Sequence, residues 1–165
     1  QSVKKKSKEN WKRRFCRLTN MRKVSKSVED TSGIAKLFAD QILLNDKSGA
    51  FVVCLSGDLG SGKTSFTKAF AKHLGVKDTI ASPTFILMKK YGLKNQKYKL
   101  LLHNDAYNLK NENELLNLGW KEIVSNKDNL IIIEWPEIVK GIIPADAHYI
   151  YLSHQDGDSR VLELK

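Results

Sequence analysis

The sequence contains few cysteines and no long apolar run, and each absence excludes a class of protein. Only Cys16 and Cys54 occur among the 165 residues, so no disulfide framework can form. Cys54 lies in the apolar run of residues 51–55, where it is typical of a small buried hydrophobic side chain. No stretch approaches 18 uncharged apolar residues, which excludes a transmembrane helix. We therefore expect a cytoplasmic protein without a membrane partner.

The size and composition of the chain fit one globular domain. Hydrophobic residues make up 41% and charged residues 28% of the sequence, which argues against disorder along the whole chain. A chain of this length buries roughly 70% of the surface that it exposes when unfolded, so one hydrophobic core can form.

The net charge of +10 is concentrated at the start of the sequence. Residues 1–20 hold eight Lys and Arg against the single acid Glu9, whereas residues 21–165 hold 20 basic and 17 acidic groups. We interpret residues 1–20 as a solvated, disordered tail, or as residues upstream of a natural start at Met21, and residues 21–165 as the domain. An RNA-binding arm is the alternative. The tail lacks the apolar segment of a secretory signal.

The hydrophobic pattern alternates between amphipathic helices and buried strands. A helix is expected from Ser27 to the turn at residues 45–49, with Ser27 or Thr31 as its N-cap. Two continuous apolar runs, residues 50–55 and 130–133, are typical of central strands. Further helices are expected at 64–74 and 112–123, further strands at 84–91 and 98–103, and a hairpin around the turn at 155–159. This order predicts an α/β fold with a mainly parallel central sheet.

One glycine-rich motif carries a specific chemistry. Residues 57–64 read Gly-Asp-Leu-Gly-Ser-Gly-Lys-Thr and match G-x-x-x-x-G-K-[ST] between an expected strand and an expected helix. Glycines allow successive backbone N–H groups to point at phosphate oxygens, Lys63 reaches the β- and γ-phosphates, and Thr64 offers its hydroxyl to Mg²⁺. The candidate nucleotide-binding residues here are Gly57, Asp58, Leu59, Gly60, Ser61, Gly62, Lys63, Thr64 and Ser65.

A phosphate-binding loop of this kind works with acidic residues that hold the metal or orient water. Glu134 ends the apolar run 130–133, and Asp105 follows the strand expected at 98–103, so both are candidates. The candidate catalytic residues are therefore Lys63, Asp105 and Glu134. The candidate metal ligands are Thr64, Asp105 and Glu134. Thr84 resembles a switch threonine that approaches the γ-phosphate.

The sequence favours ATP over GTP as the nucleotide. Residues 126–129 read Asn-Lys-Asp-Asn and differ from the guanine-reading N-K-x-D, because the Asp comes one position early and precedes its strand. The four histidines are too scattered to predict a zinc site: His73, His103, His148 and His154.

Four motifs together resemble those of a known family. Residues 57–64, 82–85 (Ser-Pro-Thr-Phe), 103–107 (His-Asn-Asp-Ala-Tyr) and 133–137 (Ile-Glu-Trp-Pro-Glu) occur in the order found in the bacterial TsaE (YjeE) family. These are small P-loop ATPases needed to make the threonylcarbamoyladenosine modification of tRNA. The resemblance runs from about residue 21 to residue 165. It implies a Rossmann-like P-loop NTPase fold, a three-layer sandwich.

The resemblance also implies an activity and partners. The chain would hydrolyse ATP to ADP and phosphate with Mg²⁺, weakly alone, and would act on a TsaD–TsaB transferase pair rather than on tRNA itself. Trp135 resembles the family tryptophan beside the nucleotide, Arg160 a late arginine near the base, and Thr31 completes the nucleotide-binding set. Asn108 stands where the family often has an arginine, so a charge-stabilising role is not expected there.

Two other functions are the alternatives to this one. A small-molecule or nucleoside kinase would need a lid with arginines that clamp phosphates, but no arginine occurs between residues 65 and 159. A non-enzymatic RNA-binding module would depend on residues 1–20, and their deletion separates it from an ATPase. The partner-gated ATPase remains the favoured hypothesis.

Overall fold

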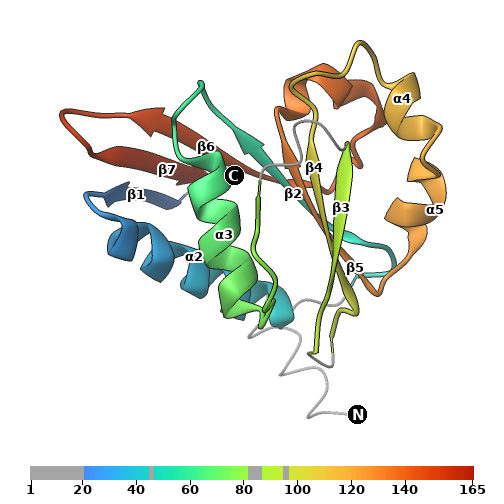
Figure 1. The fold of residues 1–165 in the computed structure, drawn as a ribbon, viewed down its shortest axis with the longest axis horizontal. Helices are drawn as coiled ribbons and strands as arrows, with labels where there is room; N and C mark the ends of the chain where they lie inside the picture. Colours follow the sequence, from blue (N-terminus) through green and yellow to red (C-terminus); the bar gives the residue numbers. More distant parts are fainter. Residues whose placement is uncertain (1–20, 45–46, 82–86, 95–96) are drawn as a thin grey trace, which may run out of the picture.

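A seven-stranded sheet with helices on both faces forms the body of the molecule (Figure 1). The computed structural model describes residues 21–44, 47–81, 87–94 and 97–165. The strands lie in the order β1-β7-β6-β2-β5-β4-β3. Among these described ranges, no helix has both the length and the apolar character needed to cross a membrane.

The sheet is mixed, which corrects the expectation of a mainly parallel one. Its four central strands, β6, β2, β5 and β4, run parallel, whereas the pairs β1–β7, β7–β6 and β4–β3 are antiparallel. A parallel pair needs a crossover of a dozen or more residues, and the connections between β3 and β4 and between β6 and β7 are too short for one. The strands are β1 (Met21–Ser25), β2 (Phe51–Ser56), β3 (Met88–Gly92), β4 (Leu100–Asp105), β5 (Asn129–Glu134), β6 (His148–His154) and β7 (Arg160–Leu164).

Two hydrophobic clusters fill the space between the sheet and its helices. Successive side chains of β2 alternate between them, because neighbouring residues of a strand point to opposite faces. Phe51, Val53 and Leu55 pack towards α2 (Val28–Leu43) and α3 (Lys63–His73). Val52 and Cys54 pack towards α4 (Asn113–Leu116), α5 (Trp120–Ser125) and the 3₁₀ helix η1 (Pro136–Ile142). The strand is therefore buried on both faces, as its unbroken apolar run predicted.

The helix expected at residues 112–123 is two short helices, α4 and α5. Gly119 separates them with a left-handed backbone (φ 80°), a conformation that glycine adopts without the penalty of a Cβ. At the start of α2, the Ser27 hydroxyl accepts from the backbone N–H of Asp30 at 3.1 Å, so Ser27 is the N-cap and Thr31 lies inside the helix. The strand expected at 98–103 runs instead from Leu100 to Asp105.

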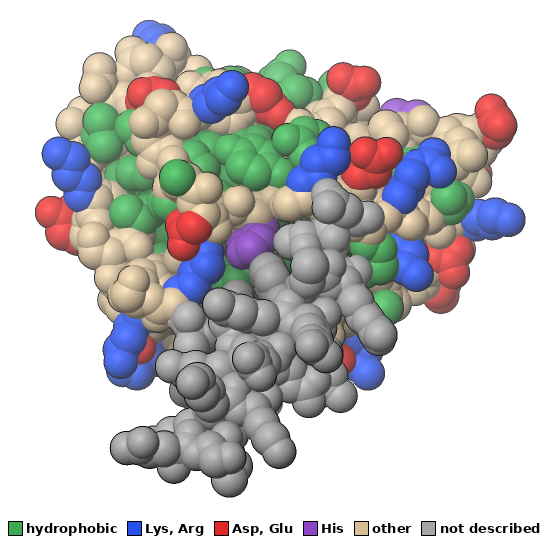
Figure 2. All heavy atoms as spheres, turned by 180° about the vertical axis from the view of Figure 1, so that it is seen from behind, with side chains coloured by type: hydrophobic (Ala, Val, Ile, Leu, Met, Phe, Trp, Pro, Cys, Tyr) green, Lys and Arg blue, Asp and Glu red, His purple; other side chains and the backbone are tan. Residues whose placement is uncertain are grey.

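The charges of the described surface are mixed. Seen from behind, Lys and Arg side chains alternate with Asp and Glu around an apolar area (Figure 2). This agrees with the nearly balanced charge of residues 21–165. The basic tail of residues 1–20 and the expected strand start at 84–86 lie outside the described residues.

The parallel strands bring three chain segments to one edge of the sheet. Leu55, beside the end of β2, pairs with Glu134 at the end of β5, and Glu134 pairs with Asp105 at the end of β4. The glycine-rich loop leaves β2 at this same edge and enters α3. In open α/β sheets, the carboxyl edge of the parallel strands is where ligands bind.

Candidate functional site

The loop between β2 and α3 has a backbone that requires glycine. Gly57, Gly60 and Gly62 have φ values of 152°, 75° and 103°. A Cβ on Gly57 would lie 2.2 Å from the carbonyl oxygen of Leu152 on β6, so the loop packs against the sheet at a distance that no side chain permits. The loop ends at the N-terminus of α3, where backbone N–H groups are left without helical partners.

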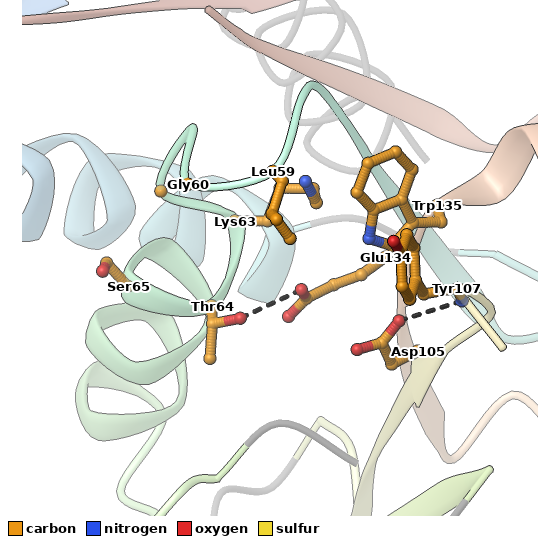
Figure 3. Close-up of a pocket in the computed structure, with 10 residues that line it drawn as sticks. Leu59, Gly60, Lys63, Thr64, Ser65, Asp105, Tyr107, Glu134 and Trp135 are labelled. Carbon is orange, nitrogen blue, oxygen red and sulfur yellow. Dashed lines mark hydrogen bonds between the residues drawn. The ribbon is translucent and has the colours of Figure 1, made fainter. Parts of the chain in front are cut away.

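A cavity of about 310 Å³ opens beside this loop (Figure 3). It brings together most of the residues that the sequence singled out, from the loop, α3, β4 and β5. Tyr107 also lines it, although no role was predicted for this residue from the sequence. Its signal was its position, two residues after Asp105 in the motif at 103–107. The lining residues are Leu59, Gly60, Gly62, Lys63, Thr64, Ser65, Asp105, Tyr107, Glu134 and Trp135.

Lys63 is held inside the loop that precedes it. Its Nζ donates to the carbonyl oxygens of Gly57 at 2.6 Å and Asp58 at 2.9 Å, and lies 4.0 Å from the ring centroid of Trp135. Burial lowers the pKa of the Lys63 amine from its ordinary value, while the nearby carboxylates of Glu134 and Asp105 oppose this shift. Two carbonyl oxygens and an aromatic face therefore hold the ammonium group.

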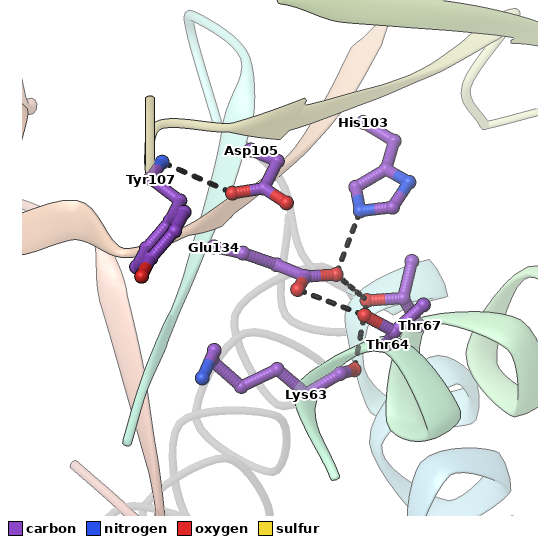
Figure 4. A network of polar contacts seen from close by, with 7 residues as sticks. All are labelled: Lys63, Thr64, Thr67, His103, Asp105, Tyr107 and Glu134. Atoms are coloured by element: carbon purple, nitrogen blue, oxygen red, sulfur yellow. Dashed lines mark hydrogen bonds and ion pairs between the residues drawn. The ribbon is translucent and has the colours of Figure 1, made fainter. Parts of the chain in front are cut away.

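Glu134 is the centre of a buried polar network (Figure 4). Its Oε2 accepts from the Thr64 hydroxyl at 3.0 Å. Its Oε1 lies 2.8 Å from Nε2 of His103 and accepts from the Thr67 hydroxyl at 3.4 Å. Only 2% of Glu134 is exposed. This arrangement joins the acid at the end of β5 to the residue that follows the lysine of the loop.

Asp105 and Trp135 complete the wall of the cavity. The Asp105 Oδ1 accepts from the backbone N–H of Tyr107 at 3.0 Å, which holds the carboxylate at the end of β4. The rings of Tyr107 and Trp135 lie 5.0 Å apart and are tilted by 47°. Trp135 has a left-handed backbone (φ 59°) directly before Pro136, which turns its indole towards Lys63.

The remaining sequence candidates lie elsewhere. The Thr31 hydroxyl contacts the Ser25 hydroxyl at 2.7 Å, and Nη1 of Arg160 donates to the Ser159 carbonyl at 3.1 Å; neither residue lines the cavity. Their contact with a nucleotide stays a prediction. Thr84 lies outside the described residues. Asp58 contributes its carbonyl to Lys63, and Ser61 is buried in the loop.

The donor atoms at this site are hard oxygen ligands. The Thr64 hydroxyl and the carboxylates of Glu134 and Asp105 line one cavity, and such oxygens suit small divalent cations. Within the described part of the chain, no group of three or more His, Cys, Asp or Glu residues could hold a metal ion by itself. A cation here would need further ligands, from water or from a bound molecule.

A glycine-rich loop between a buried strand and a helix, with a lysine at the loop's end, defines an α/β protein of the P-loop type. The family model described as "Threonylcarbamoyl adenosine biosynthesis protein TsaE" matches residues 25–162, and the chain belongs to that family. A TsaE of Rickettsia typhi is 37% identical, covering 84% of this chain and 90% of that protein. A TsaE of Bacillus subtilis is 35% identical, covering 80% of this chain and 77% of that protein.

A solved structure has the same arrangement. The crystal structure of Bacillus subtilis YdiB superposes with a TM-score of 0.70 at 26% identity, covering 88% of this chain and 84% of that chain. The resemblance noted from four short motifs therefore extends over most of the described fold.

Proposed function

We propose that this chain is a Mg²⁺-dependent ATPase of the cytoplasm that serves the threonylcarbamoyladenosine modification of tRNA. Membership of the TsaE family and the names of its relatives support the pathway. The contact between the Thr64 hydroxyl and Glu134 Oε2 at 3.0 Å, beside Lys63, is the observation that supports the chemistry. It joins a hydroxyl and a carboxylate of the kind that bind Mg²⁺ next to the loop that would hold the phosphates.

The residues present fit a magnesium ion that arrives with the nucleotide. Mg²⁺ is usually held by one or two carboxylates together with substrate phosphates. Thr64 and Glu134 would hold it, with Asp105 as the second carboxylate of the cavity. When bound, the ion neutralises negative charge that develops on the phosphate oxygens.

The chain's own groups would bind the phosphates and orient the attacking water. Backbone N–H groups of the loop and the start of α3 would bind the phosphates, and they are fixed before the reaction begins. Lys63 would exchange the carbonyls of Gly57 and Asp58 for phosphate oxygens. Asp105 and Glu134 are the two candidates for orienting the attacking water, and of these Asp105 is the one held by a backbone N–H.

The proposed partner is a TsaD–TsaB-type transferase pair, with tRNA reached only through it. The activity alone would be weak, and binding to the pair would stimulate it. This part of the proposal rests on the family resemblance. The proposed hydrolysis also distinguishes the chain from a kinase, because a kinase would pass the γ-phosphate to an acceptor molecule instead of water.

Phosphate release from Mg-ATP, with and without a purified TsaD–TsaB pair, tests the proposal. We expect slow release from the chain alone and faster release when the pair is added. Lys63→Ala and Thr64→Ala should abolish both rates. Unchanged turnover in both variants would contradict the site assignment, whereas fast release that ignores the pair would contradict only the partner.

A further inference from the structure

The two oxygens of Glu134 have different surroundings. Oε2 contacts the Thr64 hydroxyl, which lines the cavity, whereas Oε1 turns away from it towards His103 and Thr67 (Figure 4). Neither His103 nor Thr67 is among the residues that line the cavity. Oε2 is therefore available to a ligand in the cavity, while Oε1 is held by residues outside the cavity.

His103 contacts Glu134 from the neighbouring strand of the sheet. It lies on β4 opposite Ile132 of β5, two residues before Asp105, so its side chain points to the same face of the sheet as those of Asp105 and Glu134. That face is the one that α3 covers. His103 is completely buried, and its Nε2 lies 2.8 Å from Glu134 Oε1. It can affect a bound molecule only through Glu134.

Packing alone does not account for an imidazole at this position. A carboxylate only accepts hydrogen bonds, so Nε2 of His103 carries the proton and donates. Among the described residues, Nδ1 of His103 has no hydrogen-bond partner. Leaving a buried polar atom unpaired destabilises the folded state, so a leucine would suit the position better if it served packing only. The N–H directed at Glu134 is what the histidine adds.

We infer that His103 is a positioning residue for Glu134 in the proposed ATPase. It holds Oε1 so that Oε2 faces Thr64 and the place where Mg²⁺ would bind. Thr67 assists from α3, but weakly, because its hydroxyl also donates to the Lys63 carbonyl at 3.1 Å. The inference rests on the proposed function. It gives a role to a residue of the motif at 103–107 that does not line the cavity.

Two substitutions of His103 test the inference. His103→Leu fills the space and removes the N–H, whereas His103→Gln keeps a donor at about the place of Nε2. Each variant is measured for kcat, for ATP affinity with Mg²⁺, and for ATP affinity in EDTA. Asn129→Ala is the matched control, since Asn129 is buried at the opposite end of β5, where its Nδ2 donates to the Ile123 carbonyl at 3.0 Å.

For His103→Leu we expect kcat to fall about 10- to 100-fold, the range seen when a partner of a metal ligand is removed. ATP affinity with Mg²⁺ should weaken, while affinity in EDTA stays unchanged, because the phosphate-binding loop is intact. His103→Gln should recover most of both losses. Asn129→Ala should lower the free energy of unfolding and leave kcat and the Mg²⁺ dependence as in the wild type.

Three results would overturn the role of His103. The first is a folded His103→Leu variant with wild-type kcat and Mg²⁺ dependence, and the second is a His103→Gln variant as impaired as His103→Leu. The third is an equal loss of affinity with and without Mg²⁺, which indicates general damage to the fold. A wild-type chain that neither binds nor hydrolyses Mg-ATP would instead overturn the proposed function, and the role of His103 with it.

Discussion

The ammonium of Lys63 lies 4.0 Å from the ring centroid of Trp135, so the lysine of the loop rests on the indole next to it. A cation over an indole face is attracted by the quadrupole of the neutral ring, whose face has a negative electrostatic potential. The contact depends on the left-handed backbone of Trp135, because this backbone turns the ring towards the loop. Lys63 is therefore bound on one side by the loop carbonyls and on the other by an aromatic face.

We predict that ATP binding changes the fluorescence of Trp135. Lys63 must leave the ring to reach phosphate oxygens, and the charge next to the indole changes when it does. A fluorescence titration should show this change in the wild type and lose it in Trp135→Phe. Trp120 supplies the control, because it is buried and its Nε1 donates to the Ile142 carbonyl at 2.8 Å. Trp120→Phe should keep the change, and an undiminished signal in Trp135→Phe would contradict the prediction.

A second prediction concerns the charge of Glu134. Glu134→Gln keeps the shape of the side chain and removes its charge, so we expect Mg²⁺ to bind more weakly with the nucleotide. The fall in kcat should be at least as large as the 10- to 100-fold loss expected when a neighbour of a metal ligand is removed. ATP affinity in EDTA should not fall. Thr64→Ser keeps the hydroxyl and is the control, so its turnover should stay near that of the wild type.

Much of this site could be predicted from the sequence, because the loop at 57–64 is local. Its glycines, lysine and threonine act through the backbone that directly surrounds them. Glu134 and Asp105 could also be predicted, since each follows an apolar run and parallel strands end at a common edge. His103 stands in the motif at 103–107, but its contact with Glu134 could not be predicted, because Glu134 lies 31 residues away and the contact depends on the register between β4 and β5.

The edges of the sheet were harder to predict than its centre. The strand β1 has the sequence Met-Arg-Lys-Val-Ser, in which three of the five residues are exposed, so its pattern is too weak to indicate a strand. The strand forms because it pairs with β7, which lies at the other end of the sequence. The break at Gly119 was missed for another reason, because apolar residues continue at helical spacing on both sides of it.

A third prediction compares two glycines in neighbouring elements. A Cβ on Gly57 would lie 2.2 Å from the Leu152 carbonyl oxygen and 2.7 Å from the Ser61 hydroxyl, so Gly57→Ala should displace the loop and abolish ATP binding. Gly33 lies inside α2, where a Cβ would meet nothing within 4 Å. Gly33→Ala should stabilise the protein by about 1 kcal/mol and raise the melting temperature by about 2–4 °C. Thermal unfolding and ATP titrations check both, and a Gly57→Ala variant that binds ATP normally would contradict the loop geometry.

The last prediction concerns His148, which lies at the opposite end of the sheet from the cavity. Its ring stacks on Phe51 with centroids 4.6 Å apart, and Lys47 lies 4.8 Å from the centroid of the same Phe51 ring. Burial, and then the positive charge of Lys47, lower the pKa of His148 from 6.5 to about 4, while Asp146 opposes the shift. The folded protein therefore keeps this imidazole neutral at a pH where the unfolded chain would protonate it.

Stability should consequently fall as the pH drops from 6.5 towards 4, because the unfolded state binds the additional proton in that range. Above pH 6.5 both states are neutral at His148, and this residue contributes no pH dependence. The loss should reach no more than a few kcal/mol, since the side chain is partly exposed and solvent screens its charge. Carboxylates titrate in the same range, so the useful quantity is the difference in the free energy of unfolding between the wild type and His148→Phe. That difference should shift in favour of His148→Phe as the pH falls through this window, whereas parallel losses in the two proteins would show that folding does not lower the pKa of His148.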